Sequence, residues 1–449
     1  MRLLSTCSSE SRASPRLPIV AIFRALLLFA FFYAACGSCC GQAEGALCSA
    51  GSGQFVSKFD TGVTVTVGAE KNEGFATRAC EAALSWKKTS LTVVRDAWQV
   101  DIDLLGADLG QGGPVAAFQI QKSELDARKI YAVYALQRPP RLLRTISGGS
   151  FYRAADTDMD GHVEVWVHDA GGAIGFEGLP WDDFDFVPTL VLRFEGGRLL
   201  DVSSEFLSYF DRQIAQEEAA LNPRQLSDFK KSDGKLLDLT PLQMGQLHLL
   251  LAAKMKILDI VWAYLYSGRE EDAWHALRSM WPSADFDRVK AAILDAKAHG
   301  VSSQVDGVAP PASSRRRKRR VHIFDLTQTY AHDGLAPAPE SSMDRSMAGA
   351  NPYQGAIPSS RSLVSPKVIN LFTTPPPAGQ PYLPNGGLMV ELVIDAARKV
   401  HSFQLADGTI KGPIVDALLA ASANWKFIPA MSGDRPVACR IRLTLNPFR

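Results

Sequence analysis

The stretch "RFEGGRLLDVSSEFLSYFDRQIAQEEAAL", residues 193–221, marks a change in the period of the apolar residues. Its first ten residues predict a β-hairpin, because Gly196 and Gly197 can adopt the positive φ of a tight turn. Behind a serine cap, apolar residues then recur at helical spacing, at Phe206, Phe210, Ile214 and Leu221. We therefore expect strands before this stretch and helices after it.

The chain upstream of the hairpin is rich in strand patterns. "GVTVTVGA" (62–69) alternates apolar and polar residues, and short β-branched or aromatic runs follow between Gly, Pro and Asp clusters. This predicts an antiparallel β-rich domain over 44–204, either a sandwich or a propeller-like sheet. Downstream, 205–300 is expected to form a helical segment, either a small packing unit or one tetratricopeptide-type helix pair. A length of 449 residues suits such a multidomain α+β chain.

The segment 301–365 is predicted to be a disordered linker. It is rich in Ser, Pro, Ala and Gly, and it carries the basic run "SSRRRKRR" (313–320). No aromatic residue is interleaved with this run to stack on bases, and the net charge of the chain is only +1. We interpret the run as part of a solvated tether and expect no nucleic-acid partner.

The C-terminal segment, 366–449, shows the order β-β-α-β. "GGLMVELVIDAARKVHSFQLADG" predicts two strands, "GPIVDALLAASANWKFIPA" a helix and its exit, and "RPVACRIRLTLNPF" a closing strand. The elements "MVELVID", "NWKFIPA" and "GDRPV" resemble the C-terminal domain of TonB-type energy transducers. The resemblance implies that Trp425 and Phe427 cap the sheet and that Pro429 ends the strand leaving the helix.

In that family the last strand can pair with a peptide from an outer-membrane partner by edge addition. The resemblance therefore implies a partner-binding strand, formed here by Arg440, Ile441, Arg442, Leu443, Thr444 and Leu445. The alternative is a closed structural module. A transducer also needs a retained membrane anchor and a long rigid spacer, whereas similar domains occur as added modules in exported proteins.

"DTDMDGHVEVW" (156–166) is an acidic loop between strand-like flanks. It is not an EF-hand, because Val167 stands where the bidentate glutamate of that loop would be. The pattern resembles the β-hairpin calcium loop of FG-GAP and VCBS-type repeats. That resemblance implies Ca²⁺ ligands from the carboxylates and one backbone carbonyl, with Gly161 at the sharp turn; the residues are Asp156, Asp158, Asp160, His162 (carbonyl) and Glu164. The alternative is an acidic surface turn.

The N-terminus predicts export. Arginines precede the apolar run 25–36, which is short for a membrane span, and "GQA" (41–43) suits cleavage before Glu44. We expect 1–43 to be a signal peptide; an uncleaved anchor and a lipoprotein at Cys36 are the alternatives, and only the anchor would keep this segment in the membrane. In the oxidising periplasm or cell envelope, Cys48 and Cys80 are expected to form a disulfide.

No common catalytic motif occurs in the chain. The sequence therefore favours a non-enzymatic, exported bacterial envelope protein whose C-terminal module binds a partner or takes part in outer-membrane transport. Two alternatives remain: a divergent TonB-type transducer with an uncleaved anchor, and a secreted calcium-dependent hydrolase using Glu177, Asp182 and Asp183.

Overall fold

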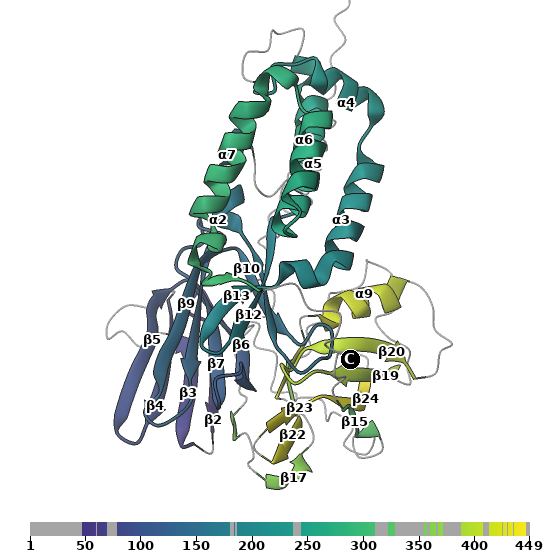
Figure 1. Cartoon of the computed structure of the whole chain (residues 1–449). Coiled ribbons are helices and arrows are strands. Elements are labelled where there is room, and N and C mark those ends of the chain that lie inside the picture. The colour runs from purple at the N-terminus through teal and green to yellow at the C-terminus, as the bar shows by residue number, and fades with distance from the viewer. Residues whose placement is uncertain are drawn as a thin grey trace, which may run out of the picture. The chain divides into compact units, whose positions relative to one another are not determined.

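The protein is a mixed α/β chain, with antiparallel strands in its N-terminal half, helices in the middle and strands near its C-terminus (Figure 1). This agrees with the expected order of strand and helix segments. The computed structural model describes residues 47–59, 61–69, 79–179, 184, 186–236, 244–309, 322–327, 354–356, 360–364, 367–370, 388–406, 413–423, 425–428, 430–433 and 435–445. The predicted signal peptide, 1–43, lies outside these residues.

The first two sheets contain the first nine strands. These are β1 (Cys48–Ser49), β2 (Gln54–Lys58), β3 (Val63–Ala69), β4 (Cys80–Trp86), β5 (Thr89–Ala97), β6 (Gln99–Asp108), β7 (Pro114–Gln121), β8 (Lys129–Ala135) and β9 (Arg141–Gly149). One sheet has the order β1-β6-β7-β8-β9. The other has the order β16-β2-β3-β4-β5, where β16 (Gln354–Ala356) comes from much later in the chain and pairs in parallel with β2.

The sheet of β6, β7 and β8 lies between two hydrophobic cores. Alternate residues of β7 point to opposite faces, so Ala116 and Phe118 join the core shared with β2–β5. Val115 and Ala117 join the other core, which contains the next sheet and the helices. This explains why β7 is a nearly continuous apolar run, whereas the alternating strand β3 is buried on one face only.

A third sheet has the order β10-β11-β12-β13-β14. Its strands are β10 (Phe151–Ala155), β11 (Glu164–His168), β12 (Thr189–Glu195), β13 (Arg198–Asp201) and β14 (Gly307–Val308). The predicted hairpin is β12–β13, in which Glu195 faces Arg198 and both central glycines have positive φ, 56° at Gly196 and 83° at Gly197. The two glycines therefore form the two-residue turn that the sequence indicates.

The longer helices begin directly after this hairpin. They are α3 (Leu207–Ala220), α4 (Pro223–Lys230), α5 (Met244–Tyr266), α6 (Glu270–Met280) and α7 (Phe286–His299). Two short helices, α2 (Ala170–Ala173) and η1 (Phe176–Gly178), precede the hairpin, and three more flank the longer helices: η3 (Ser203–Phe206), η4 (Ser283–Asp285) and η5 (Val301–Gln304). α5 contributes most to the helical core, and its Trp262 is 1% exposed and packs against Phe176 and Phe184. Gly268, with φ of +81°, allows the turn between α5 and α6.

The fold continues beyond residue 300, where the linker is predicted to begin. Val301 is fully buried, and its backbone N–H donates to the buried carboxylate of Asp169, which also accepts a hydrogen bond from the Tyr266 hydroxyl. η5 then leads into β14, which pairs in parallel with β13. The residues 301–308 therefore belong to the packed structure of the N-terminal half.

The C-terminal sheet has the order β15-β24-β19-β20. Its strands are β15 (Phe324–Asp325), β19 (Leu388–Ile394), β20 (Val400–Leu405) and β24 (Cys439–Leu445), and α9 (Pro413–Ser422) follows β20. Short strands complete this region: β17 (Ser360–Val364), β18 (Lys367–Asn370), β21 (Lys426–Ile428), β22 (Ala430–Gly433) and β23 (Arg435–Val437). Trp425 and Phe427 are buried in its core, at 2% and 0% exposure, whereas Pro429 lies outside the described residues.

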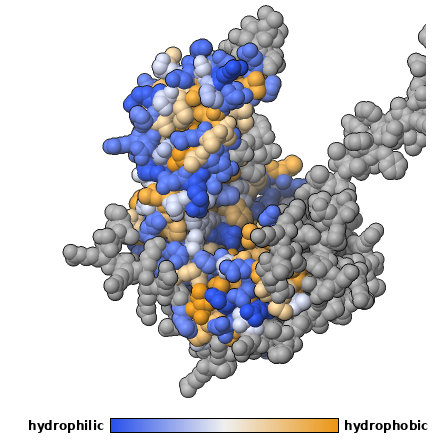
Figure 2. Space-filling model, turned by 90° about the vertical axis from the view of Figure 1, so that its right-hand side faces the viewer, coloured by the Kyte–Doolittle hydropathy of each residue, from blue (hydrophilic) through white to orange (hydrophobic). Residues whose placement is uncertain are grey.

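Most large apolar side chains of the described residues are buried, and the exposed ones are dispersed along the chain. Figure 2 shows small groups of hydrophobic residues bordered by hydrophilic residues on the face in view. The most exposed large apolar residues, Leu125 and Val308, lie far apart in the sequence. Single exposed apolar residues of this kind are common on protein surfaces and do not by themselves indicate a binding site.

Candidate metal centre

The acidic loop, 156–164, connects two antiparallel strands. β10 pairs with β11 so that Ala155 faces Glu164, and the loop residues project beyond the last pair of the hairpin. Its flanks are strands, as the pattern predicts. Gly161 has a φ of +95°, a conformation that L side chains rarely adopt, and it lies where the loop turns back towards β11.

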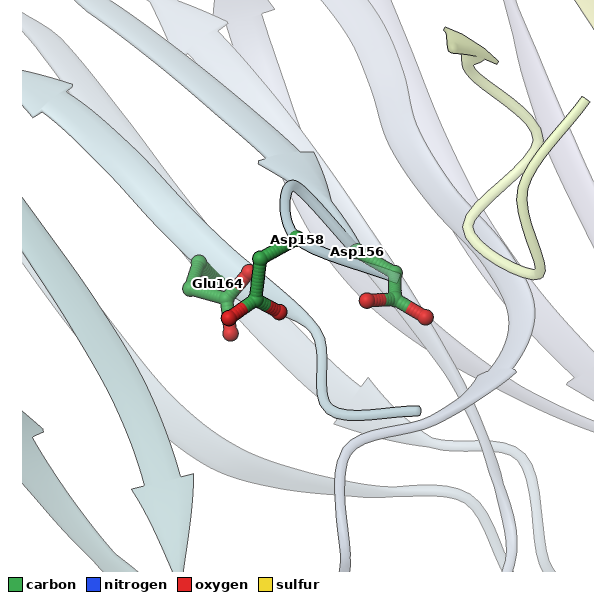
Figure 3. A group of neighbouring side chains, drawn as sticks. All are labelled: Asp156, Asp158 and Glu164. Atoms are coloured by element: carbon green, nitrogen blue, oxygen red, sulfur yellow. The ribbon is translucent and has the colours of Figure 1, made fainter. Parts of the chain in front are cut away.

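Three of the predicted ligands lie together. One carboxylate oxygen from each of Asp156, Asp158 and Glu164 falls within a group whose members are all within 4.8 Å of one another (Figure 3). Asp160 lies outside this group, and its carboxylate accepts a hydrogen bond from the backbone N–H of His162 at 2.9 Å. His162 is exposed, and its predicted contribution was its backbone carbonyl oxygen rather than its ring.

Asp156 organises the loop from the end of β10. Its two carboxylate oxygens accept hydrogen bonds from the backbone N–H groups of Asp160 and Gly161, each at 3.0 Å. Burial nevertheless raises the pKa of the Asp156 carboxyl to about 6, with smaller contributions from the neighbouring aspartates. The loop therefore holds a buried carboxylate whose charge is only partly stabilised by the backbone.

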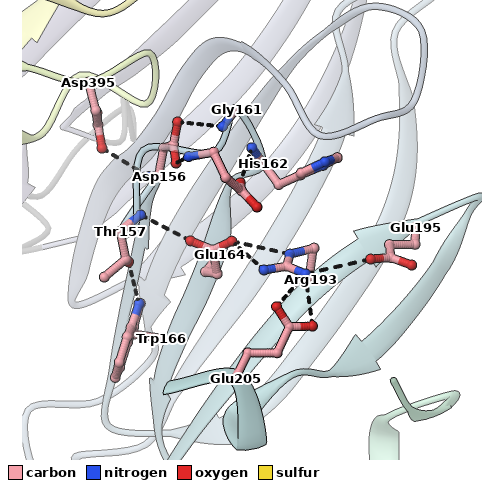
Figure 4. A network of polar contacts seen from close by, with 11 residues as sticks. Asp156, Thr157, Gly161, His162, Glu164, Trp166, Arg193, Glu195, Glu205 and Asp395 are labelled. Atoms are coloured by element: carbon pink, nitrogen blue, oxygen red, sulfur yellow. Dashed lines mark hydrogen bonds and ion pairs between the residues drawn. The ribbon is translucent and has the colours of Figure 1, made fainter. Parts of the chain in front are cut away.

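Glu164 is held by an arginine of the next strand. Glu164 and Arg193 face each other across β11 and β12, and the Nη2 and Nε atoms of the arginine donate to one oxygen of Glu164 at 2.9 and 3.1 Å (Figure 4). The other oxygen accepts the backbone N–H of Thr157. Arg193 also donates to Glu205 through Nη1, at 3.2 and 3.1 Å, and the same atom lies 3.7 Å from a carboxylate oxygen of Glu195, so a single buried cation pairs with three carboxylates.

The charges of Glu164 and Arg193 shift each other's pKa values in the directions expected for an ion pair. Burial raises the pKa of Glu164 to about 8, against the effects of Thr157 and Arg193. Burial alone would lower the pKa of Arg193, but the two glutamates raise it overall. The raised pKa values favour the protonated forms of the buried carboxyls, and a cation beside the three clustered carboxylates would stabilise their ionised forms instead.

The donor set fits a hard divalent cation. Ca²⁺ takes about six to eight oxygen ligands, so the three carboxylates would need additional oxygens from the backbone, from Asp160 or from water. Arg193 occupies one oxygen of Glu164 and reduces the charge available to a metal. The loop can therefore hold a cation with one carboxylate oxygen from each of Asp156, Asp158 and Glu164 as its protein ligands.

A segment from the C-terminal half contacts the same loop. The turn 395–399, which we call the C-terminal turn, connects β19 to β20, and its Asp395 accepts the backbone N–H of Asp156 at 2.9 Å (Figure 4). Met159 of the loop packs with Val393 and Ala438 in a small cluster. The sequence pattern predicts a turn between these two strands, but nothing in it indicates that the turn contacts the acidic loop.

The other predicted site residues lie in three places. Cys48 and Cys80 form the expected disulfide, with Cα atoms 5.9 Å apart. The predicted partner-binding strand, 440–445, lies in β24. Glu177, proposed for the hydrolase alternative, is bound by Lys254 and Arg288, while Asp182 and Asp183 lie outside the described residues.

Comparisons with protein-family models, curated proteins and solved structures found no match. Within the described part of the chain, no helix combines the length and apolarity needed to cross a membrane.

Proposed function

We propose that this chain is a non-enzymatic, exported protein of the bacterial cell envelope that binds an extended segment of a partner at the edge of β24. The observation that carries this proposal is the incomplete pairing of that strand. β24 pairs with β19 along its whole length, whereas β15 covers only Cys439 and Arg440 on the opposite side. Among the described residues, no strand pairs with the remainder of that side.

The backbone of β24 is suited to accept a strand there. The backbone carbonyl of Arg440 accepts the N–H of Leu326 on the β15 side of the strand. Because the backbone groups of every second residue point to the same side, the backbone N–H and C=O of Arg442 and Thr444 also point to that side. Arg440 and Arg442 have side chains that are 45% exposed, and both lie near Glu391. A partner strand with carboxylate side chains on that face would complement the two arginines, which share one glutamate.

A proline in place of Thr444 tests the edge. Thr444→Pro removes an outward N–H and should abolish strand addition, whereas Thr444→Ala keeps that N–H and serves as the matched control. Extended peptides would be selected on the full chain from a display library, and their affinities measured by fluorescence anisotropy. We expect Thr444→Ala to bind like the unchanged protein; equal binding by Thr444→Pro would refute edge addition, provided that circular dichroism shows both variants to be folded.

Export is supported by the leader pattern together with the disulfide between Cys48 and Cys80, since disulfides persist mainly in oxidising compartments. Mass spectrometry and N-terminal sequencing of the protein produced in a bacterium with an outer membrane test this point. A mature chain starting near Glu44 in the periplasmic fraction is expected. Recovery of a chain that still begins at Met1 would contradict cleavage and would favour the transducer alternative.

We also propose that the acidic loop binds Ca²⁺, because three carboxylates with oxygens within 4.8 Å suit a hard cation. Isothermal titration of the full chain with Ca²⁺ should show one site with a Kd of about 0.1 to 1 mM, the range of extracellular modules. Asp158→Asn should weaken binding, whereas Asp287→Asn, an exposed change of the same charge on α7, should not. Absence of binding at millimolar Ca²⁺ would end this proposal.

A further inference from the structure

Strand β6, which lies between β1 and β7 in its sheet, contains a shift of register in its pairing with β7. In its pairing with β7, Ile102 faces Phe118 and Leu104 faces Ala117, so Asp103 is the extra residue of a β-bulge. A bulge interrupts the ladder of hydrogen bonds and redirects polar groups of the strand. Asp103 is nevertheless 2% exposed, so its polar groups need partners within the protein.

The side chain of Arg398 fills this position. Its Nη2 donates to the carbonyl oxygens of Ile102 and Asp103, each at 3.0 Å, and the residue is 4% exposed. Arg398 has a φ of +74°, a left-handed conformation that is unfavourable for a residue with a Cβ atom. An unfavourable backbone conformation persists only where surrounding contacts stabilise it, and here those contacts come from β6.

The next residue of the turn binds the same bulge. The Nζ of Lys399 donates to one carboxylate oxygen of Asp103 at 2.5 Å. The other oxygen accepts the Tyr131 hydroxyl at 2.8 Å and the backbone N–H of Ala154 at 2.7 Å. Asp103 therefore joins β8 and β10 of the N-terminal half to a lysine located 296 residues later in the chain.

The remaining residues of the turn contact the acidic loop and the core. Asp395 holds the ends of the turn by accepting the backbone N–H of Lys399 at 2.7 Å, while its second oxygen accepts the N–H of Asp156. Ala397 is fully buried and belongs to the hydrophobic core of the N-terminal half and the helices. The basic side chains of the turn, Arg398 and Lys399, thus bind the bulge at Asp103 of β6. Its acidic residue, Asp395, binds the backbone N–H of Asp156 in the loop.

We propose that the C-terminal turn is a latch that fastens the C-terminal sheet to the β6 bulge, and that the acidic loop is ordered only while the latch is closed. The surface at the bulge is an interaction site, and its occupant is the segment 395–399 of the same chain. The coupling between latch and loop follows from their shared contacts, which are the Asp395–Asp156 hydrogen bond and the packing of Met159 on Val393 and Ala438. It requires neither Ca²⁺ nor a partner at β24.

Hydrogen exchange of the full chain, measured by mass spectrometry without Ca²⁺, tests the latch. Arg398→Gly removes the anchoring side chain and suits the left-handed backbone at that position, so the hairpin β19–β20 keeps its turn. We expect the amides of residues 156–164 to exchange at least tenfold faster than in the unchanged protein. Peptides from α6 should exchange as before. Arg440→Met, which removes a positive charge from the exposed side of the same sheet, is the matched control and should leave the loop unchanged.

A structural role confined to the hairpin would give a different result. Faster exchange limited to 395–405, with the loop 156–164 unaffected, would overturn the latch. If Arg398→Gly does not fold, Lys399→Met carries the test, because it removes the contact with Asp103 and leaves the backbone and Arg398 intact. Faster loop exchange in Lys399→Met then supports the proposal, and unchanged loop exchange refutes it.

Discussion

Two buried arginines border the acidic loop, and they differ in what they bind. Arg193 is 3% exposed and pairs with the carboxylates of Glu164 and Glu205, whereas Arg398 is 4% exposed and donates to two backbone carbonyls. The partner Glu164 lies 29 residues from Arg193 on an adjacent strand; Ile102 lies 296 residues from Arg398. The contact between Arg193 and Glu164 follows from the register of two adjacent strands. The contact between Arg398 and Ile102 depends on two segments that are distant in the sequence packing against each other.

The largest effect is expected from replacing Arg193. Arg193→Met leaves Glu164 buried at 0% exposure without its cation, and removal of one partner of a buried pair costs about 3 to 5 kcal/mol. The free energy of unfolding should fall by that amount in urea denaturation followed by circular dichroism. EDTA should be present, so that a bound metal cannot replace the arginine.

The matched control is Arg224→Met, an exposed change of the same kind on α4, which should alter the free energy by less than about 0.5 kcal/mol. The double variant Glu164→Leu/Arg193→Met should recover much of the loss, since two apolar side chains can replace a buried ion pair. A double variant as unstable as the single one would show that Arg193 stabilises the sheet mainly through Glu205.

A smaller decrease in the free energy of unfolding is expected when Arg398 is replaced. Arg398→Gly removes two hydrogen bonds from a charged donor, each contributing about 1.5 to 3 kcal/mol, but it relieves a left-handed conformation that costs roughly 1 to 2 kcal/mol. The midpoints of these ranges give a net decrease of about 3 kcal/mol in the free energy of unfolding, compared with about 4 kcal/mol for Arg193→Met. A change equal to or larger than that of Arg193→Met would contradict the distinction between an ion pair and a carbonyl contact.

The difference between contacts of neighbouring strands and contacts of distant segments also decides what the sequence could predict. The hairpin at Gly196 and Gly197, the helices that follow it and the strands flanking the acidic loop depend on short-range patterns, and the structure contains each of them. The Cys48–Cys80 disulfide, which joins residues 32 apart, follows from the cysteine content of a chain predicted to be exported and is also present. The pairing of Arg193 with Glu164 requires the register of β11 and β12, which the apolar alternation alone does not fix.

The contact of Arg398 could not be predicted in this way. It depends on a bulge at Asp103 of β6, and the sequence of that strand, QVDIDLLGAD, does not show where the pairing with β7 shifts register. Nor does the sequence show that alternate residues of β6 belong to different hydrophobic cores, with Ile102 in one and Leu104 in the other. The segment from Val301 onward has the composition of a linker, although Val301 itself is buried and its backbone N–H donates to the distant Asp169.

A third arginine, Arg288 on α7, extends the comparison towards the surface and should show the smallest effect. Its side chain is 36% exposed, and its Nη2 donates to Glu177 at 2.9 Å and to Asp285 at 2.7 Å. Burial raises the pKa of each carboxyl, but the hydrogen bonds from Arg288 contribute to a net lowering of both from their ordinary values of 4.5 and 3.8. Solvent screening limits the contribution of such a pair to about 1 kcal/mol or less.

The pH dependence of Arg288→Met distinguishes charge from packing. Because the folded pKa of each carboxyl lies below its unfolded value, its contribution is present at neutral pH and is lost as the pH falls through the folded pKa. Urea denaturation of both proteins at pH 7, 5, 4 and 3 should therefore show a difference in unfolding free energy that is constant down to about pH 5 and then shrinks. A difference that persists undiminished at pH 3 would show that the aliphatic part of Arg288 stabilises the protein by packing, and the exposed arginine would then differ in kind from the two buried ones.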